Sequence, residues 1–374
     1  MSFCNFVCYY VYMNFWNKKI ISFEDSYFGL DLGESSVKVF QLEKDGDIDR
    51  IRSFSVREIG AGYIENGQII EAEKLSKAIC ETISSAGPKK INTKKVICSI
   101  PESKVFLRTI DIPIIEETEA AEAIKWEIEA GIPLEIDKVY FDWQFLEQKD
   151  GKQRVLTVAV SREVVDNLVT VLESCGLSVC GMEMESVATA RSIIPDNSGE
   201  EDAYLVVDIG ALKTSFIIIQ KGVPCFTSSI PFSSQGITDL IASHIGISHE
   251  EADKIKISQG IEHSSAGKTN PVVALLRPLL ENLSTEIERT IDFYRTFPDN
   301  GAEIKKVIIS GGSANLKGLA AYLATKLAYE VVLGNPWINL NLGKNLPIIS
   351  RSDSIRYTTA IGLAMRGMSY GDKT

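Results

Sequence analysis

Residues 28–42 read FGLDLGESSVKVFQL, and residues 204–219 read YLVVDIGALKTSFIII. Each stretch has an apolar run, then Asp-x-Gly, a short polar segment and a second apolar run, which predicts a β-hairpin with glycine in its turn. The two aspartates, Asp31 and Asp208, lie 177 positions apart, about half of the chain. A supersecondary unit repeated at that spacing indicates two related lobes.

The turns of the two hairpins have the composition of a phosphate-binding loop. Gly33 and Gly210 allow a tight turn and let the backbone approach a ligand without a Cβ in the way. Backbone N–H groups of such turns, together with the hydroxyls of Ser35, Ser36 and Thr214, are suited to surround phosphate oxygens.

The aspartates add a metal to this interpretation. Asp31 and Asp208 repel phosphate, so their presence makes sense if Mg²⁺ lies between carboxylate and phosphate, bound through its waters. One Asp-x-Gly alone is common in plain turns. Two of them on matching hairpins are much stronger evidence for a binding site.

A third element lies near the C-terminal end. Residues 307–318 read VIISGGSANLKG and are followed by LAAYLATKLAYEV, which predicts a buried strand, a turn at Gly311 and Gly312, and an amphipathic helix. The missing Cβ atoms allow a flat base to lie against this backbone. Hairpin, hairpin and Gly-Gly turn, in this order, resemble the phosphate 1, phosphate 2 and adenosine motifs of the actin–hexokinase–Hsp70 superfamily.

Composition limits the class of protein. The chain has 374 residues, more than one ordinary core accommodates, and a net charge of −11 with a pI of about 5.0. Such a charge argues against nucleic acid as a partner. Seven cysteines without a C-x-x-C pair, and three histidines far from them in sequence, argue against zinc or a disulfide framework and favour reduced thiols in the cytoplasm.

The first 26 residues are unusual. They begin with MSFCNFVCYYVYMNFW, an apolar run that is shorter than the ~20 residues of a membrane span. No small-residue cleavage site follows, which argues against a signal peptide. We interpret residues 1–26 as an N-terminal extension, with two alternatives: translation starts at Met13, or the segment is a weak interfacial anchor.

The chain between the hairpins predicts a β–α–β–β–α block. Residues 96–112 are strand-like with a break at Pro101, residues 116–130 predict a helix ended by Gly131 and Pro133, residues 139–148 and 154–161 predict paired strands, and residues 162–175 predict a second helix. For the first helix we expect a buried stripe and a solvated acidic face. The stripe consists of Ala120, Ala123, Ile124, Trp126 and Ile128.

This block, with the segments SIPESKVFLRTIDIP, AIKWEIEAGIPLEIDKVYFDWQFL, LESCGLSVCGMEMES and LVVDIGALKTSF, resembles the PilM family of type IV pilus assembly proteins and its relative FtsA over residues 27–367. The resemblance implies an α/β, actin-like (ribonuclease H-like) fold of two lobes, with subdomain 1C in place of actin's 1B. It assigns 27–100, 173–203 and 346–374 to subdomain 1A, 101–172 to 1C, 204–238 and 303–345 to 2A, and 239–302 to 2B.

The resemblance also implies which residues bind ATP and Mg²⁺ in a cleft between the lobes. They are Asp31, Gly33 and Ser35 in phosphate 1, Asp208, Gly210 and Thr214 in phosphate 2, Gly311 and Gly312 in the adenosine turn, and Glu251 and Lys254 for ribose and base, with Asp31 and Asp208 at the metal. An exposed ion pair is the alternative for Glu251 and Lys254. Glu185 lies where related kinases have a catalytic acid, and a structural acid is the interpretation we favour. Lys38 is interpreted as a surface residue.

As a family member, the protein is expected to be an ATP-binding scaffold in the cytoplasm, peripheral to the inner membrane. Its expected partners are the cytoplasmic N-terminal tail of a PilN-like membrane protein, the PilN/PilO complex, the pilus motor ATPases and other copies of itself in a ring. Residues 211–213 replace the glycines common in phosphate 2, so weak or absent hydrolysis is expected. The alternatives are an FtsA-like division protein, which usually ends in a basic amphipathic helix, a small-molecule kinase, and a secretion-system adaptor of the GspL type.

Overall fold

The computed structural model describes residues 26–197, 199, 202–220, 222–262, 271–296, 302–344 and 347–371. Except for Ser26, the N-terminal extension lies outside the described residues. The chain divides into two compact units: unit 1 comprises Met1–Ala188 and Thr359–Thr374, and unit 2 comprises Thr189–Thr358. The limits of the four subdomains stay a prediction.

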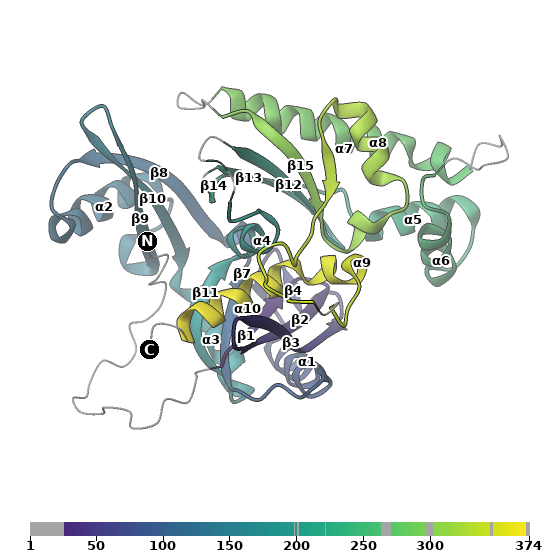
Figure 1. Ribbon diagram of the computed structural model, residues 1–374, viewed down its shortest axis with the longest axis horizontal. Coiled ribbons are helices and arrows are strands. Elements are labelled where there is room, and N and C mark those ends of the chain that lie inside the picture. The colour runs from purple at the N-terminus through teal and green to yellow at the C-terminus, as the bar shows by residue number, and fades with distance from the viewer. Residues whose placement is uncertain are drawn as a thin grey trace. The chain divides into compact units, whose positions relative to one another are not determined.

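A six-stranded sheet with the order β11-β7-β1-β2-β3-β6 forms the centre of unit 1 (Figure 1). Its strands are β1 (Phe28–Leu32), β2 (Ser36–Asp45), β3 (Ile48–Glu58), β6 (Gly87–Pro88), β7 (Lys95–Ile100) and β11 (Ser178–Met184), and a separate small hairpin joins β4 (Ile64–Glu65) and β5 (Gln68–Ile69). The predicted hairpin of residues 28–42 is confirmed, because β1 and β2 pair antiparallel.

Helices cover both faces of this sheet. On one face, α1 (Ala72–Ser84) and α3 (Arg162–Ser174) pack against the alternate side chains Phe28, Leu30 and Leu32 of β1. On the other face lies α10 (Thr358–Gly371), which approaches β1 so closely that a Cβ on Gly29 would be 2.3 Å from the carbonyl oxygen of Ala360. Asp31 has the same strand parity as Gly29 and therefore points away from the main core.

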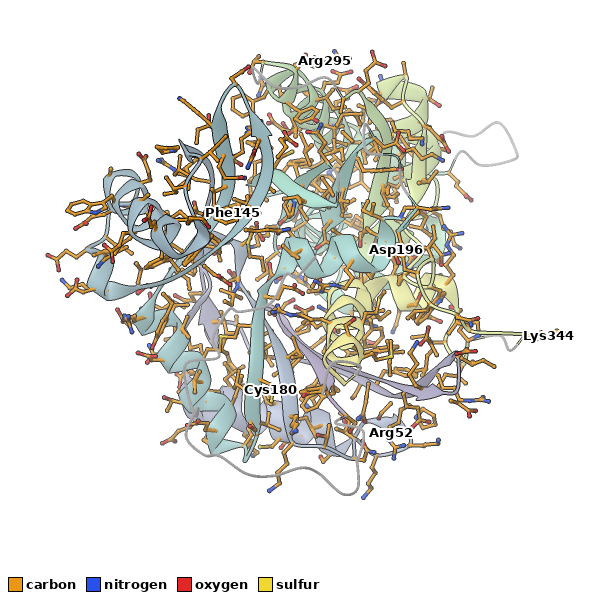
Figure 2. The ribbon with its side chains drawn as sticks, turned by 60° about the vertical axis from the view of Figure 1, so that its left-hand side comes forward. Arg52, Phe145, Cys180, Asp196, Arg295 and Lys344 are labelled. Carbon is orange, nitrogen blue, oxygen red and sulfur yellow. The ribbon has the colours of Figure 1, made fainter. Side chains whose placement is uncertain are left out.

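The predicted β–α–β–β–α block is confirmed. It consists of β8 (Val105–Pro113), α2 (Glu117–Gly131), β9 (Val139–Lys149), β10 (Lys152–Ser161) and α3, with short 3₁₀ turns at Glu102–Lys104 and Ile136–Lys138. The three strands form an antiparallel sheet of order β8-β10-β9, and α2 packs on one of its faces beside Phe145 (Figure 2). The expected stripe of α2 is right for Ala120, Ile124 and Ile128, and wrong for Trp126, which is 70% exposed.

Unit 2 is built on a five-stranded sheet of order β14-β13-β12-β15-β16. The strands are β12 (Ala203–Ile209), β13 (Thr214–Gln220), β14 (Val223–Ile230), β15 (Ile304–Ser310) and β16 (Val331–Leu333). The predicted second hairpin is confirmed, since β12 and β13 pair antiparallel, and β15 lies parallel to β12 on its other side.

The helices of unit 2 gather mostly on one face of this sheet, where its largest hydrophobic cluster lies. They are α5 (Ser234–Ile245), α6 (His249–Gln259), α7 (Pro271–Arg295), α8 (Leu319–Leu327) and α9 (Arg351–Ser354), with 3₁₀ turns at Gly312–Asn315 and Ile355–Tyr357. The opposite face packs against Ala190 and Ile193 of α4 (Glu185–Ile193) and against Ile194, which follows this helix. Among the described residues, no helix combines the length and the hydropathy needed to cross a bilayer.

Candidate functional site

The first hairpin places a buried ion pair beside its turn. Asp31 lies opposite Lys38 in the β1–β2 register, and its Oδ2 is 2.8 Å from the Lys38 ammonium. Only 5% of Asp31 is exposed, and the Ser99 hydroxyl donates to its Oδ1 at 3.3 Å. Lys38, which sequence analysis interpreted as a surface residue, is therefore the counter-charge of the predicted metal ligand. Counting outward from the turn would have found this pair, because strand register is fixed by the turn.

The turn between these strands leaves hydrogen-bond donors available. The Gly33 amide donates to the Ser36 carbonyl at 3.0 Å and closes the turn. The amides of Glu34 and Ser35, and the Ser35 hydroxyl, have no acceptor among the described residues. Two adjacent free amides in a turn form a site suited to an anion. This is the property that the phosphate 1 assignment requires of the turn that Gly33 closes and that contains Ser35.

Glu185 belongs to the same region of unit 1. It begins α4 and is half-buried. Burial, and then the negative charges of Asp31 and Glu185, raise the pKa of the Cys98 thiol. The two carboxylates thus influence one buried group. A catalytic role of Glu185 stays a prediction.

The second hairpin repeats the turn of the first. Asp208 lies opposite Ser215, so Ser215 occupies the register position that Lys38 has in unit 1. The Gly210 amide donates to the Lys213 carbonyl at 2.9 Å. The amides of Ala211, Leu212 and Lys213 have no acceptor in the described part of the chain. This turn therefore also offers free amides, although it lacks the glycines of many relatives.

Helix α5 holds the second turn in place. The amides of Ser234 and Gln235, at its N-terminus, donate to the carbonyls of Gly210 and Ala211 at 3.1 and 3.0 Å. Ser233 caps the helix by accepting from the Gly236 amide. The first helical N–H groups are thus used to fix the turn.

Thr214 occupies a different environment from the one that sequence predicts for a phosphate ligand. It is fully buried, and its hydroxyl donates to the Phe232 carbonyl at 2.7 Å. The reason is strand parity: Thr214 points to the face of Phe216 and Ile218, which belong to the main core of unit 2, whereas Asp208 points to the other face. Its role at a ligand stays a prediction.

The Gly-Gly turn lies directly beside Asp208. Gly311 has a φ of +84°, and a Cβ there would be 2.5 Å from the Ile209 carbonyl oxygen and 2.7 Å from Asp208 Oδ1. Only glycine fits this position. At Gly312 the nearest atom to an added Cβ is the Cβ of Arg356, at 4.0 Å, so this surface is open. Arg356 is exposed, forms no ion pair within the described ranges, and was not identified from sequence.

The predicted ribose and base contacts on α6 have local partners. The Glu251 carboxylate forms a capping box with Ser248, whose hydroxyl and amide donate to it and lower its pKa. Lys254 pairs with Glu250 at 2.6 Å. The Ser-x-x-Glu pattern of residues 248–251 is the sequence signal for this cap. The alternative interpretation, an exposed pair of Glu251 with Lys254, is therefore right about an exposed ion pair and wrong about its acid, which is Glu250.

Lys256 is the cation of α6 that reaches the turn region. Its side chain is 11% exposed, and its ammonium donates to the hydroxyls of Ser234 and Thr238 at 2.8 and 2.9 Å. An ion pair of 2.5 Å with Asp253 neutralises it. Because Ser234 itself binds the Gly210 carbonyl, Lys256 lies one residue away from the second turn.

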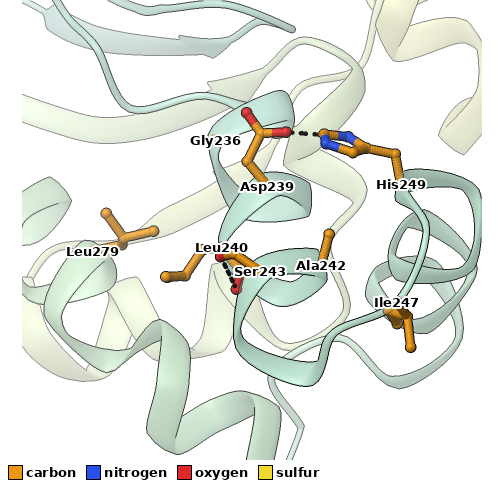
Figure 3. Close-up of a pocket in the computed structure, with 8 residues that line it drawn as sticks. All are labelled: Gly236, Asp239, Leu240, Ala242, Ser243, Ile247, His249 and Leu279. Atoms are coloured by element: carbon orange, nitrogen blue, oxygen red, sulfur yellow. Dashed lines mark hydrogen bonds and ion pairs between the residues drawn. The ribbon is translucent and has the colours of Figure 1, made fainter.

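A separate open pocket of about 660 Å³ lies along α5, next to the start of α6 and to Leu279 of α7 (Figure 3). At its rim, His249 Nδ1 lies 3.1 Å from Asp239 Oδ1. None of the site residues predicted from sequence lines it. The two turns, rather than this pocket, carry the nucleotide hypothesis.

Oxygen ligands at the two turns suit Mg²⁺. Asp31 and Asp208 supply one carboxylate each, and the described residues contain no group of three or more His, Cys, Asp or Glu side chains that could hold a metal. Mg²⁺ keeps several waters and takes one or two carboxylates together with substrate phosphates. Each turn by itself therefore offers an oxygen ligand of the kind that Mg²⁺ takes, and neither turn has the ligands of a closed structural metal site.

Comparison with known proteins now identifies the family. The family described as type IV pilus assembly protein PilM matches residues 29–368. The chain belongs to the PilM family. A chain of the solved PilM-PilN type IV pilus biogenesis complex has the same fold, with a TM-score of 0.75, 24% identity, and coverage of 92% of this chain and 99% of that chain.

Other relatives place the PilM family in the actin-like class. Cell division protein FtsA of Staphylococcus epidermidis is 24% identical over 357 residues, covering 84% of this chain and 75% of FtsA. MreB5 of Spiroplasma citri, solved bound to AMPPNP, gives a TM-score of 0.53 at 13% identity and covers 93% of this chain and 97% of that chain. The fold is thus the mixed α/β actin-like ATPase fold that was expected.

Proposed function

We propose that this PilM-family protein is an ATP-binding scaffold of the type IV pilus inner-membrane complex, and that it binds the cytoplasmic N-terminal tail of a PilN-like membrane protein. The observation that carries the proposal is the family match over residues 29–368, together with the common fold over 99% of a chain solved in a PilM-PilN complex. In this proposal the protein lies in the cytoplasm and is held at the inner membrane by its PilN-like partner. It also contacts PilO and the motor ATPases, and copies of it assemble into a ring.

ATP and Mg²⁺ are assigned to two half-sites, one in each unit. The free amides of the two turns are suited to phosphate oxygens, and the open backbone at Gly312 is suited to a base. In each half-site, bound Mg²⁺ would supply positive charge between a phosphate and the carboxylate, which is Asp31 in unit 1 and Asp208 in unit 2. Gly33, Ser35, Gly210, Thr214, Glu251, Lys254 and Gly311 complete the proposed set.

The half-sites favour binding over rapid hydrolysis. Ala211, Leu212 and Lys213 occupy the second turn, so its backbone is less free than a glycine-rich loop to wrap a transferring phosphate. Lys38 already neutralises Asp31, which fixes the carboxylate in one place. We therefore propose that the nucleotide acts mainly by stabilising one conformation of the scaffold.

The tail is assigned to the face of the three-stranded sheet that α2 does not cover. Leu107, Leu146 and Val158 point to that face by strand parity and are only half-buried. Gln144 Oε1 is buried there and accepts no hydrogen bond from the described residues. Such an acceptor fits a backbone N–H of an extended tail, and β8 and β9 are both edge strands of this sheet.

Calorimetry with the N-terminal peptide of the PilN-like protein tests the function. The peptide is titrated into the purified protein with and without Mg-ATP, and a scrambled peptide serves as control. We expect binding that strengthens with Mg-ATP and loses this dependence in Asp208→Ala but not in Asp137→Ala, an exposed aspartate outside the half-sites. No binding in either state, with ATP turnover alone, would contradict the scaffold function.

The similarity to FtsA over 84% of this chain favours a second candidate, a protein that polymerises in cell division. Sedimentation of the protein with Mg-ATP and lipid vesicles separates the two. Long polymers on vesicles that form without any tail peptide support the division function. Discrete rings, or no assembly, support the pilus scaffold.

A further inference from the structure

Helix α2 carries an exposed tryptophan that no described residue of unit 1 covers. Ala120, Ile124 and Ile128 point into the cluster between α2 and its sheet, and they are at most 3% exposed. Trp126 lies on the outward side of the same helix and is 70% exposed. An indole that is mostly in water buries little of its large apolar surface, so the fold itself gains little from this residue.

Three glutamates share the outward face with Trp126. Glu119, Glu122 and Glu129 lie seven and four positions before it and three positions after it, so all three project from the same side of the helix. They are exposed and have no ion pair among the described residues. We name these four residues, Glu119, Glu122, Trp126 and Glu129, the Trp126 stripe.

The chemistry of the stripe selects a cation. The face of an indole attracts an ammonium or guanidinium group, and neighbouring carboxylates add charge-assisted hydrogen bonds. Like charges along one helix face cost stability in the free protein, and a cationic partner would relieve this cost. The same carboxylates repel an anionic membrane surface and nucleic acid.

We propose that the Trp126 stripe is a docking surface for a cationic segment of a partner protein. An Arg or Lys of that segment lies over the indole of Trp126, and its neighbours pair with Glu122 and Glu129. Arg fits better than Lys, because its planar guanidinium stacks on the ring and binds carboxylates in a fork. The surface is independent of the nucleotide half-sites and of the proposed tail site, which lies on the other face of the sheet under α2.

Fluorescence anisotropy with a labelled peptide of alternating Ala and Arg tests this surface in the full chain. The reference peptide has citrulline at every Arg, which keeps the shape and removes the charge. We expect the Arg peptide alone to bind. Trp126→Ala should weaken it about five- to tenfold, with partial rescue in Trp126→Phe. The double variant Glu122→Gln/Glu129→Gln should weaken it by a similar factor.

The control for general electrostatics is Glu73→Gln/Glu173→Gln, which removes the same charge from exposed positions on α1 and α3. We expect this control to bind like the unmodified protein. An equal loss in the control, or unchanged binding in Trp126→Ala, would overturn the proposal. Self-association that Trp126→Ala abolishes in sedimentation velocity, with no peptide binding, would also overturn it by assigning the stripe to a second copy of this chain.

Discussion

Lys38 lies opposite Asp31 across the β1–β2 hairpin, with 2.8 Å between ammonium and carboxylate, whereas the matching position opposite Asp208 is held by the uncharged Ser215. The two hairpins therefore share one backbone structure, but they differ in the charge of the residue opposite the aspartate. In unit 1 the carboxylate is buried and its charge is compensated inside the protein. The first half-site is consequently stabilised by its own residues before any ligand binds.

Removing the Lys38 charge is expected to destabilise unit 1. Among the described residues, Lys38→Met leaves the Ser99 hydroxyl as the one side-chain donor to the Asp31 carboxylate, which is 5% exposed. Because an unpaired buried charge is costly, we expect a loss of about 2–3 kcal/mol in the free energy of unfolding, measured with urea. Asp31→Asn in the same chain should recover part of this loss.

The control for Lys38 is Lys138→Met. Lys138 also pairs with an acid, Glu135, at 2.6 Å, but both side chains are well exposed. Water screens such a pair, so its removal should leave the urea midpoint unchanged. Equal destabilisation in both variants would mean that burial of Asp31 does not decide the effect.

Gly311 and Gly312 are adjacent and should respond differently to alanine. Gly311→Ala places a Cβ 2.5 Å from the Ile209 carbonyl oxygen at a φ of +84°, so we expect a loss of about 2–4 kcal/mol in stability. Gly312→Ala meets no atom closer than 4.0 Å and should fold normally. If a base lies against this backbone, Gly312→Ala still weakens ATP binding in calorimetry. Unchanged affinity in a folded Gly312→Ala protein would exclude Gly312 from the base site.

Sequence predicts the backbone of the site better than its side chains. Alternating apolar runs with Asp-x-Gly turns define both hairpins, because strand parity and turn glycines are local properties. Thr214 shows what remains hidden, because its direction depends on which face of the sheet carries the helices, and tertiary packing decides this. The error at Trp126 is of another kind. Trp126 lies two positions from both Ile124 and Ile128, so helical periodicity alone turns it away from the buried stripe.

Asp142 on β9 is expected to make stability depend on pH. Burial raises its pKa from 3.8 to about 6, although the Trp143 amide and the charge of Arg366 lower it. A raised folded-state pKa means that its contribution is fully present below pH 3.8 and is lost as pH rises through about 6. Asp142→Asn should therefore exceed the unmodified protein in stability by about 1 kcal/mol at neutral pH, discounted for partial exposure.

The pH experiment has an internal reference. The urea midpoints of Asp142→Asn and of the unmodified protein are compared below pH 3.8 and above about pH 6, on the two sides of the pH range in which Asp142 ionises. The advantage of the variant should vanish on the acidic side, where the carboxyl is protonated in both folded and unfolded chains. An advantage that is equal on both sides would assign the effect to the shape of the asparagine rather than to ionisation.

Substitutions of Lys256 and Lys254 test whether α6 supports the second turn or contacts the ribose and base directly. Lys256 is 11% exposed and bridges Asp253 to the hydroxyls of Ser234 and Thr238, whereas Lys254 is 70% exposed and pairs only with Glu250. Lys256→Met removes a cation that supports the α5 N-terminus, which itself holds the Gly210 turn, so we expect about tenfold weaker ATP binding and lower stability of unit 2. Lys254→Met should fold normally, and unchanged ATP affinity in this variant would remove Lys254 from the proposed set and leave its ion pair with Glu250 as a surface feature. A selective loss of ATP binding in Lys254→Met, with Lys256→Met unaffected, would instead place the ribose and base on the exposed side of α6, as the family resemblance implies.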